Sequence, residues 1–148
     1  MAGSLKITSN AKQVILNDIK AFSDKFERAM PTALNVIGIE AVNKARNITT
    51  YTDRTGNLRS SIGYVVGKKR SKLVTDIKAF FGKKESKERG EVKAQKLADS
   101  FELTGDYSLV IFAAMEYADY VERKGKDVLT GSMPSQDEFI NTIKEYMQ

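Results

Sequence analysis

Cysteine and histidine are both absent from the 148 residues of this chain. Without cysteine there is no disulfide framework and no thiol nucleophile. Without histidine the chain lacks the most common general base and the most common zinc ligand. These absences exclude Ser–His–Asp triads, HExxH zinc sites and Cys/His zinc clusters. Catalysis by carboxylates or lysine, and metal sites built from carboxylates alone, are the remaining possibilities.

Long apolar runs are missing as well. A membrane-spanning helix needs about 20 consecutive apolar residues, whereas the longest apolar run here covers residues 109–115. The first six residues contain no continuous apolar segment, so we expect no secretory signal peptide there. The sequence therefore predicts no membrane partner, and folding in the cytoplasm is compatible with the lack of cysteine.

What is present fits one folded domain covering residues 1–148, with residues 1–10 as a flexible N-terminus. Hydrophobic residues make up 41% and charged residues 29%, a balance that argues against general disorder. The net charge of +5 is unevenly distributed, because residues 67–96 carry eleven Lys and Arg against four Asp and Glu and the remainder sums to −2. We expect this basic segment to be a loop-rich insertion.

The N-terminal third shows a helical pattern. Apolar residues recur every three or four positions from residue 14 to residue 29, which is typical of an amphipathic helix, and Asn10 could cap its start. Pro31 interrupts the pattern because proline has no backbone N–H. It also suits the first turn of a new helix, and a second apolar face continues to about residue 47. The sequence predicts two helices, or one long helix kinked near Met30.

The rest of the chain predicts three strands and two more helices. Residues 107–114 give the strongest strand signal, and their near-continuous apolar run indicates a central strand buried on both faces. The other expected elements are strands at 62–66 and 73–81 joined by an exposed loop at 68–72, a charged loop at 82–90, a helix at 91–101, an extended segment at 116–121, a turn at 124–127 and a C-terminal helix at 134–146 with Ser132 or Ser135 near its start.

The order of these elements indicates the fold class. Helices come first and the later strands do not alternate strictly with helices, which favours an α+β fold with a mainly antiparallel sheet over a doubly wound parallel sheet. We expect the N-terminal helices to pack on this small sheet together with the C-terminal helix.

Signals for chemistry are sparse. Neither a GxxxxGK[ST] loop nor a GxGxxG motif occurs, and we expect no cofactor and no small-molecule substrate. Asp53 and Glu122 lie near turns, but general acid–base catalysis needs two groups held at a defined separation, and nothing in the sequence brings them together. We interpret them as solvated or ion-paired carboxylates, with an enzyme of unrecognised type as the alternative. Three tyrosines flank the strong strand and fit edge packing or a subunit contact: Tyr107, Tyr117 and Tyr120.

The basic segment suggests contact with an anionic partner. Lysine and arginine runs neutralise phosphates and bind nucleic acid without reading its sequence, although solvated loop lysines are common and no helix-turn-helix, RNA-recognition or zinc-finger pattern is present. Contact with DNA or with an acidic protein surface remains the alternative to a merely solvated loop. The candidate contact residues are Lys68, Lys69, Arg70, Lys72, Lys83 and Lys84.

Two short motifs carry a resemblance to a known family. Residues 51–62 read YTDRTGNLRSSI after the helical region, and residues 117–125 read YADYVERKG after the strong strand. Together and in this order they resemble the TGxLrxSi and YAxYVExG elements of the HK97 gp10-like family of phage tail components, with one extra residue before the last glycine. The matching positions are Thr55, Gly56, Leu58, Tyr117, Tyr120, Glu122 and Gly125.

The motifs also make physical sense. Thr55 and Gly56 would provide a sharp exit from the second helix, because glycine tolerates positive φ, and Leu58 would return the chain to the core. Tyr117 would begin a strand-like ridge that ends at the Gly125 turn.

The resemblance implies a non-enzymatic virion protein of a tailed phage or prophage. Such proteins complete the tail and join it to the head connector, so the expected partners are further copies of the chain in a ring, six in related proteins, and other head-connector or tail proteins. The expected location is the neck or tail region of the virion, with assembly in the host cytoplasm. The runner-up hypothesis is a sequence-nonspecific nucleic-acid-binding protein that uses residues 67–96.

Overall fold

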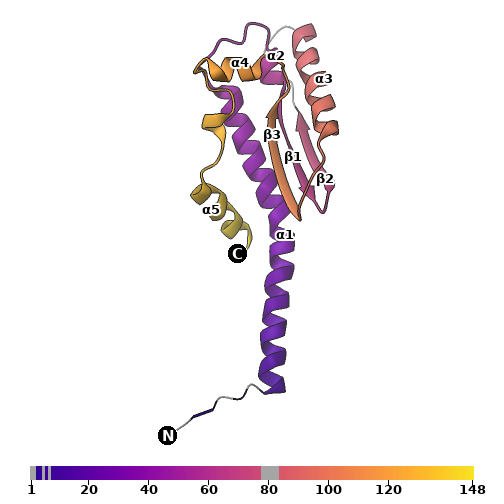
Figure 1. Ribbon diagram of the computed structural model, residues 1–148, viewed down its shortest axis with the longest axis vertical. Coiled ribbons are helices and arrows are strands. Elements are labelled where there is room, and N and C mark those ends of the chain that lie inside the picture. Colours follow the sequence, from indigo (N-terminus) through magenta and orange to yellow (C-terminus); the bar gives the residue numbers. More distant parts are fainter. Residues whose placement is uncertain (1–2, 5, 7, 78–83) are drawn as a thin grey trace.

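The computed structural model describes residues 3, 4, 6, 8–77 and 84–148, without the side chains of residues 84–88. It confirms the α+β class: a long N-terminal helix and a short C-terminal helix pack with a small antiparallel sheet (Figure 1). In chain order the elements are α1 (Ser9–Asn47), α2 (Asn57–Ser60), β1 (Ile62–Lys68), β2 (Ser71–Ile77), α3 (Lys84–Ser100), β3 (Tyr107–Ala113), α4 (Ala118–Arg123), the 3-10 turn η1 (Thr130–Ser132) and α5 (Gln136–Tyr146).

α1 is one unbroken helix of 39 residues. Thr8 is its N-cap, with the side-chain hydroxyl accepting a hydrogen bond from the Ala11 N–H at 3.2 Å, so Asn10 is not the cap. Pro31 lies inside the helix. An internal proline bends helices, and Figure 1 shows α1 changing direction where it joins the rest of the fold. Of the two alternatives drawn from the sequence, the single long helix is confirmed.

The sheet has the order β2-β1-β3 with both pairings antiparallel. The prediction that β3 is the central strand is therefore wrong: β1 is central and β3 is an edge strand. The apolar run of β3 has another cause, because helices cover both faces of the sheet. β1 gives a weaker apolar signal because Gly63 and Gly67 interrupt it. At Gly63 a Cβ would lie 2.8 Å from the Asp76 carbonyl oxygen, so the close packing of the strands excludes a side chain.

Two apolar clusters fill the two sides of the sheet. Against α1, the cluster includes Leu34, Leu58, Ile62, Tyr64 and Val66. Against α3, the smaller cluster consists of buried Val65, Ala94, Ala98, Leu103 and Phe112. The alternation along β1 follows from the period of two that every strand imposes.

Two further local predictions are wrong. The described part of the segment expected to be a charged loop, from Lys84 on, is helical, because α3 continues through Gly90 without interruption. Gly90 allows this helix to lie against α2, where a Cβ would meet Ser60 Cβ at 3.1 Å. The segment expected to be extended contains helix α4. Its apolar Ala118 and Val121 are three residues apart on the core side, and Arg123 pairs with Asp119 at 2.6 Å across one turn.

Gly38 provides a direct test of the packing between α1 and β1. A Cβ there would lie closer than 3.0 Å to three ring carbons of Tyr64, and this ring is held in place because its hydroxyl donates a hydrogen bond to Asn35 Oδ1 at 2.8 Å. We expect Gly38→Ala to lower the free energy of unfolding in urea by about 1–3 kcal/mol, although alanine is the better helix former. In the Tyr64→Leu background the same change should be neutral or stabilising. An equal loss in both backgrounds would contradict this packing.

Candidate assembly surface

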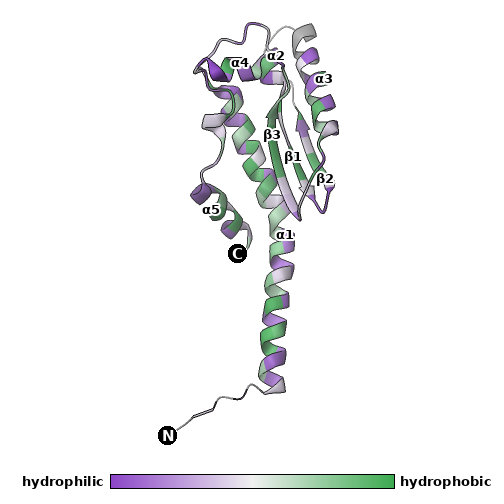
Figure 2. Ribbon diagram, viewed as in Figure 1, coloured by the Kyte–Doolittle hydropathy of each residue, from purple (hydrophilic) through white to green (hydrophobic). Residues whose placement is uncertain are grey.

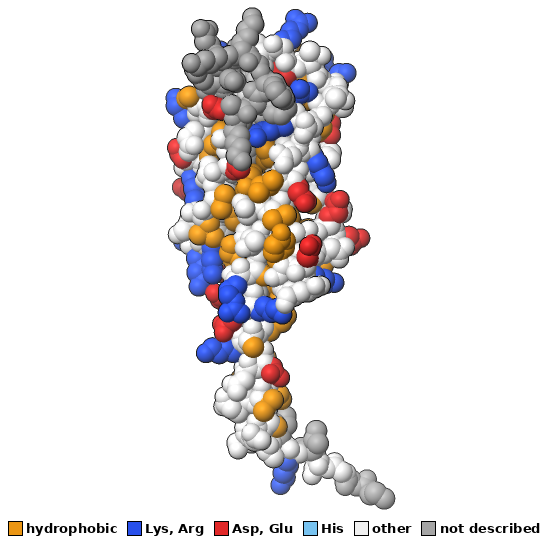
Figure 3. Space-filling view, turned by 180° about the vertical axis from the view of Figure 1, so that it is seen from behind, with side chains coloured by type: hydrophobic (Ala, Val, Ile, Leu, Met, Phe, Trp, Pro, Cys, Tyr) orange, Lys and Arg blue, Asp and Glu red, His pale blue; other side chains and the backbone are white. Residues whose placement is uncertain are grey.

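The first half of α1 projects from the body as a helical arm, defined here as residues 9–25. Every residue of the arm is exposed, and Figure 1 shows the arm extending away from the other elements. Its exposed residues nevertheless include large apolar ones: the exposed fractions are 51% for Ile15, 59% for Ile19 and 63% for Phe22. Figure 2 shows apolar and polar bands alternating along the arm, and Figure 3 shows apolar side chains on its surface. The arm thus presents an amphipathic face that no element in the described part of the chain covers.

The apolar face of the arm continues into the core without a break. The stripe formed by Ile15, Ile19 and Phe22 continues with Phe26 and then with buried Met30. The ring of Phe26 packs edge-on against Tyr107 at a centroid distance of 5.8 Å. Spacings of three and four keep these residues on one side of the helix. The same stripe therefore packs against the sheet in its second half and is exposed in its first half.

Two physical properties of the arm are typical of helices that pack against another protein surface. Most helix stability in proteins comes from packing of an apolar face, and the apolar face of the arm has no such packing within the described part of the chain. Full burial of one large apolar side chain contributes about 1.5–3 kcal/mol. Burying the half-exposed residues of the arm would accordingly contribute on the order of 4–7 kcal/mol, before the cost of association. These residues are Val14, Ile15, Leu16, Ile19 and Phe22.

A groove of about 400 Å³ lies at the root of the arm. Its walls are α1, the edge strand β3 and the segment that leads into α5; Figure 1 shows β3 and α5 on either side of α1. The lining is mostly apolar, and one lining residue, Met133, is 46% exposed. We call this the β3 groove; its lining residues are Met30, Leu34, Tyr107, Ser108, Leu109, Ile111, Met133, Pro134 and Phe139.

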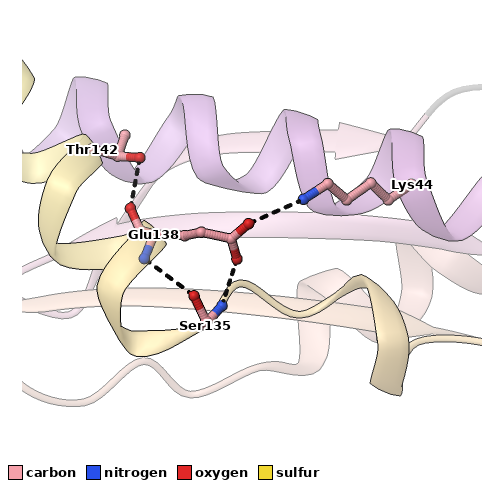
Figure 4. Close-up of polar contacts among 4 residues, drawn as sticks. All are labelled: Lys44, Ser135, Glu138 and Thr142. Atoms are coloured by element: carbon pink, nitrogen blue, oxygen red, sulfur yellow. Dashed lines mark hydrogen bonds and ion pairs between the residues drawn. The ribbon is translucent and has the colours of Figure 1, made fainter.

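The outer wall of the groove is fixed by polar contacts of α5. Ser135 caps this helix, with its hydroxyl accepting from the Glu138 N–H at 3.2 Å, while the Glu138 carboxylate accepts from the Ser135 N–H at 2.8 Å. The same carboxylate pairs with Lys44 of α1 at 3.8 Å (Figure 4). These hydrogen bonds from Ser135, together with attraction by Lys44, lower the pKa of Glu138. Since no residue of α5 is buried, the contacts of one partly exposed face and this capping network hold the helix in place.

The predicted basic cluster is divided by the structure. Lys68 pairs with Glu27 at 3.3 Å, and Lys72 donates hydrogen bonds to the carbonyls of Ala98 and Asp99 near the end of α3, at 2.6 and 2.9 Å. A lysine at a helix C-terminus is favoured by the helix dipole. Both lysines thus have partners within the subunit. Lys83 lies outside the described residues, and Lys84 begins α3 with its side chain outside them.

The remaining two cations, Lys69 and Arg70, form the exposed tip of the hairpin. Both have positive φ, 49° and 67°, in a two-residue loop between paired Lys68 and Ser71. Such loops favour Asn-Gly, because left-handed backbone is costly for residues with a Cβ. The hairpin therefore presents two cations at positions where asparagine and glycine would be more stable.

The first family motif forms a compact turn before β1. The Asp53 carboxylate accepts hydrogen bonds from the N–H groups of Gly56 and Arg59, both at 2.9 Å, and Thr55 Oγ1 accepts from the Asn57 N–H at 3.3 Å. Gly56 has φ 81°, the left-handed conformation that favours glycine. Leu58 follows and is 2% exposed, as the sequence predicted.

The second motif fixes the turn after α4 through Glu122. Its carboxylate accepts hydrogen bonds from the N–H groups of Val128, Leu129 and Thr130 at 2.8, 3.1 and 3.3 Å. Burial alone would raise the pKa of Glu122, but the hydrogen bonds from Thr130, Leu129 and Val128 outweigh it and lower the pKa. Gly125, with φ 72°, reverses the chain between Glu122 and the three N–H groups that it binds. The expected strand-like ridge is wrong, because Tyr117 and Tyr120 belong to the start and the exposed side of a helix.

We expect Glu122→Gln to lower the free energy of unfolding at neutral pH by about 1–3 kcal/mol, since the charged acceptor is lost from a partly exposed site while one acceptor oxygen remains. A lowered pKa in the folded state stabilises above the pKa of the unfolded chain, about 4.3 for glutamate, and this stabilisation disappears as the pH falls through the folded pKa. The difference between wild type and variant, measured by urea denaturation, should therefore shrink below about pH 4.

The control for this prediction is Asp119→Asn. Asp119 has an exposed side chain and pairs with Arg123 across one helical turn, a kind of pair that contributes about 0.3–0.5 kcal/mol. An equal loss of stability for both substitutions, or a loss for Glu122→Gln that persists at acidic pH, would show that Glu122 does not act through its charge.

The candidate catalytic carboxylates have structural roles: Asp53 and Glu122 each accept hydrogen bonds from two or three backbone N–H groups. Within the described residues, no group of three or more Asp and Glu side chains is placed to hold a metal ion. No helix in the part of the chain that the structure describes is long and apolar enough to cross a membrane.

The exposed arm was not predicted as a surface. The amphipathic pattern indicated a helix, but a period of 3.6 says only that one face is apolar. The sequence did contain one sign of an additional apolar surface, because Val14, Ile15 and Leu16 are consecutive. At these residues the apolar surface of the helix is wider than a single stripe, as in helices that have protein on several sides.

Comparison with known proteins agrees with the motifs. A protein-family model described as "Bacteriophage HK97-gp10, putative tail-component" matches residues 13–123, three quarters of the chain. This match includes most of the arm, the first motif, the whole sheet and the second motif as far as Arg123, and ends before Gly125 and α5. No curated protein and no solved structure matches the chain. The chain therefore belongs to the HK97 gp10-like family of phage tail components.

Proposed function

We propose that this chain is a non-enzymatic structural subunit of the virion that completes the tail and joins it to the head connector. It acts by assembling with further copies into a ring, for which the resemblance implies six subunits. The observation that carries the proposal is the helical arm: residues 9–25 are all exposed and expose large apolar side chains. A surface of this kind is typical of assembly sites.

The polar residues of the family motifs support a structural rather than a catalytic role. Asp53 and Glu122 are hydrogen-bonded to backbone N–H groups of their own turns. A general acid or base needs a carboxyl group free to exchange a proton with substrate. The motifs maintain the turns that hold α2 and α4 against the core, and so maintain the surfaces that neighbouring subunits contact.

The test of ring assembly is the molar mass in solution. Light scattering behind a sizing column, over a range of concentrations and at two salt concentrations, should give one discrete oligomer whose mass does not depend on salt, because the contact is apolar. Negative-stain electron microscopy of the same fraction should show closed rings. A strict monomer at every concentration would contradict self-assembly of this chain.

A second candidate function, binding of DNA without sequence preference, is favoured by one observation: Lys69 and Arg70 occupy positive-φ positions at the hairpin tip. Left-handed backbone costs about 1–2 kcal/mol per non-glycine residue, which suggests that the charges themselves are needed. In the assembled ring these tips would contact DNA phosphates or an acidic protein surface.

Fluorescence anisotropy with a short duplex at two salt concentrations tests this second function. DNA binding predicts an affinity that falls steeply with salt and is lost in the double variant Lys69→Glu, Arg70→Glu. The matched control is Lys124→Glu, Lys126→Glu, which reverses two exposed charges at the turn after α4. Equal losses in both double variants would indicate an effect of net charge alone, and no measurable binding by wild type would leave a protein surface as the partner of the tip.

A further inference from the structure

The arm and the β3 groove are complementary apolar surfaces that cannot meet within one molecule. Met30 and Leu34, which line the groove, belong to the same helix as the arm, and the arm leaves the body at this point. An α-helix rises about 1.5 Å per residue, so the tip of the arm lies tens of ångströms from the groove at its root. Each molecule therefore offers an apolar projection and an apolar recess. Among the side chains that the structure describes, none covers the projection and none fills the recess.

We propose that the arm of each subunit docks into the β3 groove of a second copy of this chain, in a head-to-tail contact. The inference rests on the proposed function and identifies the two surfaces of its ring contact. The docked arm would extend an interface that already exists inside the subunit, in which Phe26 packs edge-on against Tyr107 of β3. Ile19 and Phe22, which carry the same stripe outward, would make the equivalent contact with the next subunit.

Charge supports the pairing of these two surfaces. Residues 9–25 of the arm carry three lysines against two aspartates, whereas α5, which forms the outer wall of the groove, carries three acidic residues against one lysine. The excess charges are opposite. Charges at the rim of an interface mainly set the rate of association and the choice of partner, while the apolar stripe provides the affinity.

Symmetry distinguishes this contact from the obvious alternative, in which two arms pair with each other. Arm against arm uses the same patch on both copies and gives a closed dimer, whereas arm into groove uses two different patches and propagates until rotation closes a ring. The arm also has Val14 and Leu16 to either side of Ile15, which is wider than the two-position seam of a two-stranded coiled coil. A groove covers such a surface better than a single partner helix does.

Cysteine cross-linking tests the contact directly, because the chain has no cysteine of its own. Two single variants are used, Ile19→Cys on the stripe of the arm and Met133→Cys on the rim of the groove, both at exposed positions. They are co-expressed, treated with a short bismaleimide and separated on a denaturing gel. Head-to-tail docking predicts a cross-linked dimer in the mixture and none in either variant alone.

The matched control replaces the arm variant by Asp24→Cys, which lies five residues from Ile19 and about 140° round the helix from it. Paired with Met133→Cys, it should show loss of the cross-linked band. Circular dichroism of each variant establishes that the fold is retained.

Light scattering on the same samples separates failure of this inference from failure of the proposed function. A discrete oligomer in which Ile19→Cys cross-links to itself would overturn head-to-tail docking in favour of paired arms, and ring assembly would then need another surface. A discrete oligomer with no cross-link in the mixture would overturn the docking site but leave the proposed function standing. A monomer without cross-links would overturn both.

Discussion

Replacing Ile19 with aspartate is expected to dissociate the assembled protein while leaving the subunit folded. Ile19 is 59% exposed in the single chain, so its loss removes no core contact. In the assembly the substitution would remove about 1–2 kcal/mol of apolar burial, since only the exposed 59% of Ile19 is left for the contact to bury, and would add the cost of desolvating a carboxylate. A loss of at least about 3 kcal/mol per contact corresponds to a dissociation constant raised about 100-fold or more.

Sizing with light scattering measures the dissociation, and circular dichroism with a thermal melt measures the fold. The matched control is Asn17→Asp, which adds the same charge on the same exposed helix, two positions before Ile19 and about 200° round its axis. Asn17 accepts a hydrogen bond from Gln13 at 3.0 Å through Oδ1, and aspartate keeps this acceptor. Unchanged assembly in Ile19→Asp, or equal dissociation in the control, would show that the apolar stripe is not the contact surface.

Replacing Leu58 with alanine is expected to have the largest effect on the stability of the subunit itself. Leu58 is 2% exposed and packs in the cluster between α1 and the sheet. A buried leucine replaced by alanine leaves a cavity and costs about 2–5 kcal/mol. For a domain of this size the melting temperature should fall by about 4–20 °C. The measurements are urea denaturation for the free energy of unfolding and a thermal melt for the melting temperature, both in the Ile19→Asp background, so that assembly does not add to the apparent stability.

Replacing a leucine of the arm with alanine should weaken assembly without lowering the stability of the subunit. Leu16 is 49% exposed, and alanine is a slightly better helix former than leucine. In the Ile19→Asp background, Leu16→Ala should therefore change the free energy of unfolding by no more than about 0.5 kcal/mol. In the otherwise unmodified protein, the same substitution should weaken the association of the subunits. If Leu16→Ala destabilised the monomer as much as Leu58→Ala does, the arm would have to be packed against its own subunit.

The local sequence determined those features that depend on neighbouring residues. The spacing of apolar residues identified both terminal helices. Of the two serines expected near the start of α5, Ser132 and Ser135, it is Ser135 whose hydroxyl caps the helix. Gly56 and Gly125 have the positive φ that a turn at each position requires. The order of the two motifs placed the chain in its family, which the family match confirms.

The local sequence led to wrong predictions where the same residue types are compatible with two kinds of secondary structure. The Tyr and Val residues before Gly125 favour a strand, yet the segment is helix α4, because Ala118 and Val121 pack in the core with helical spacing. The charged stretch from Lys84 to Gly90 looked like a loop, yet it forms the first two turns of α3. In each case the tertiary contact outweighs a weak local preference.

Only the tertiary structure decided where β3 lies in the sheet, how the basic residues divide and which half of α1 is free. An apolar run reports that both faces of a strand are covered, but hydrogen-bond pairing with β1 on one side alone makes β3 an edge strand. Lys68 and Lys72 are held by groups distant in sequence, which leaves Lys69 and Arg70 at the tip. The apolar stripe of α1 is one continuous pattern, and the length of the sheet determines how much of it is covered.

The sequence by itself determined the family, the fold class and the apolar face of the long helix. The exposed arm arises because the helix is longer than the body against which it packs.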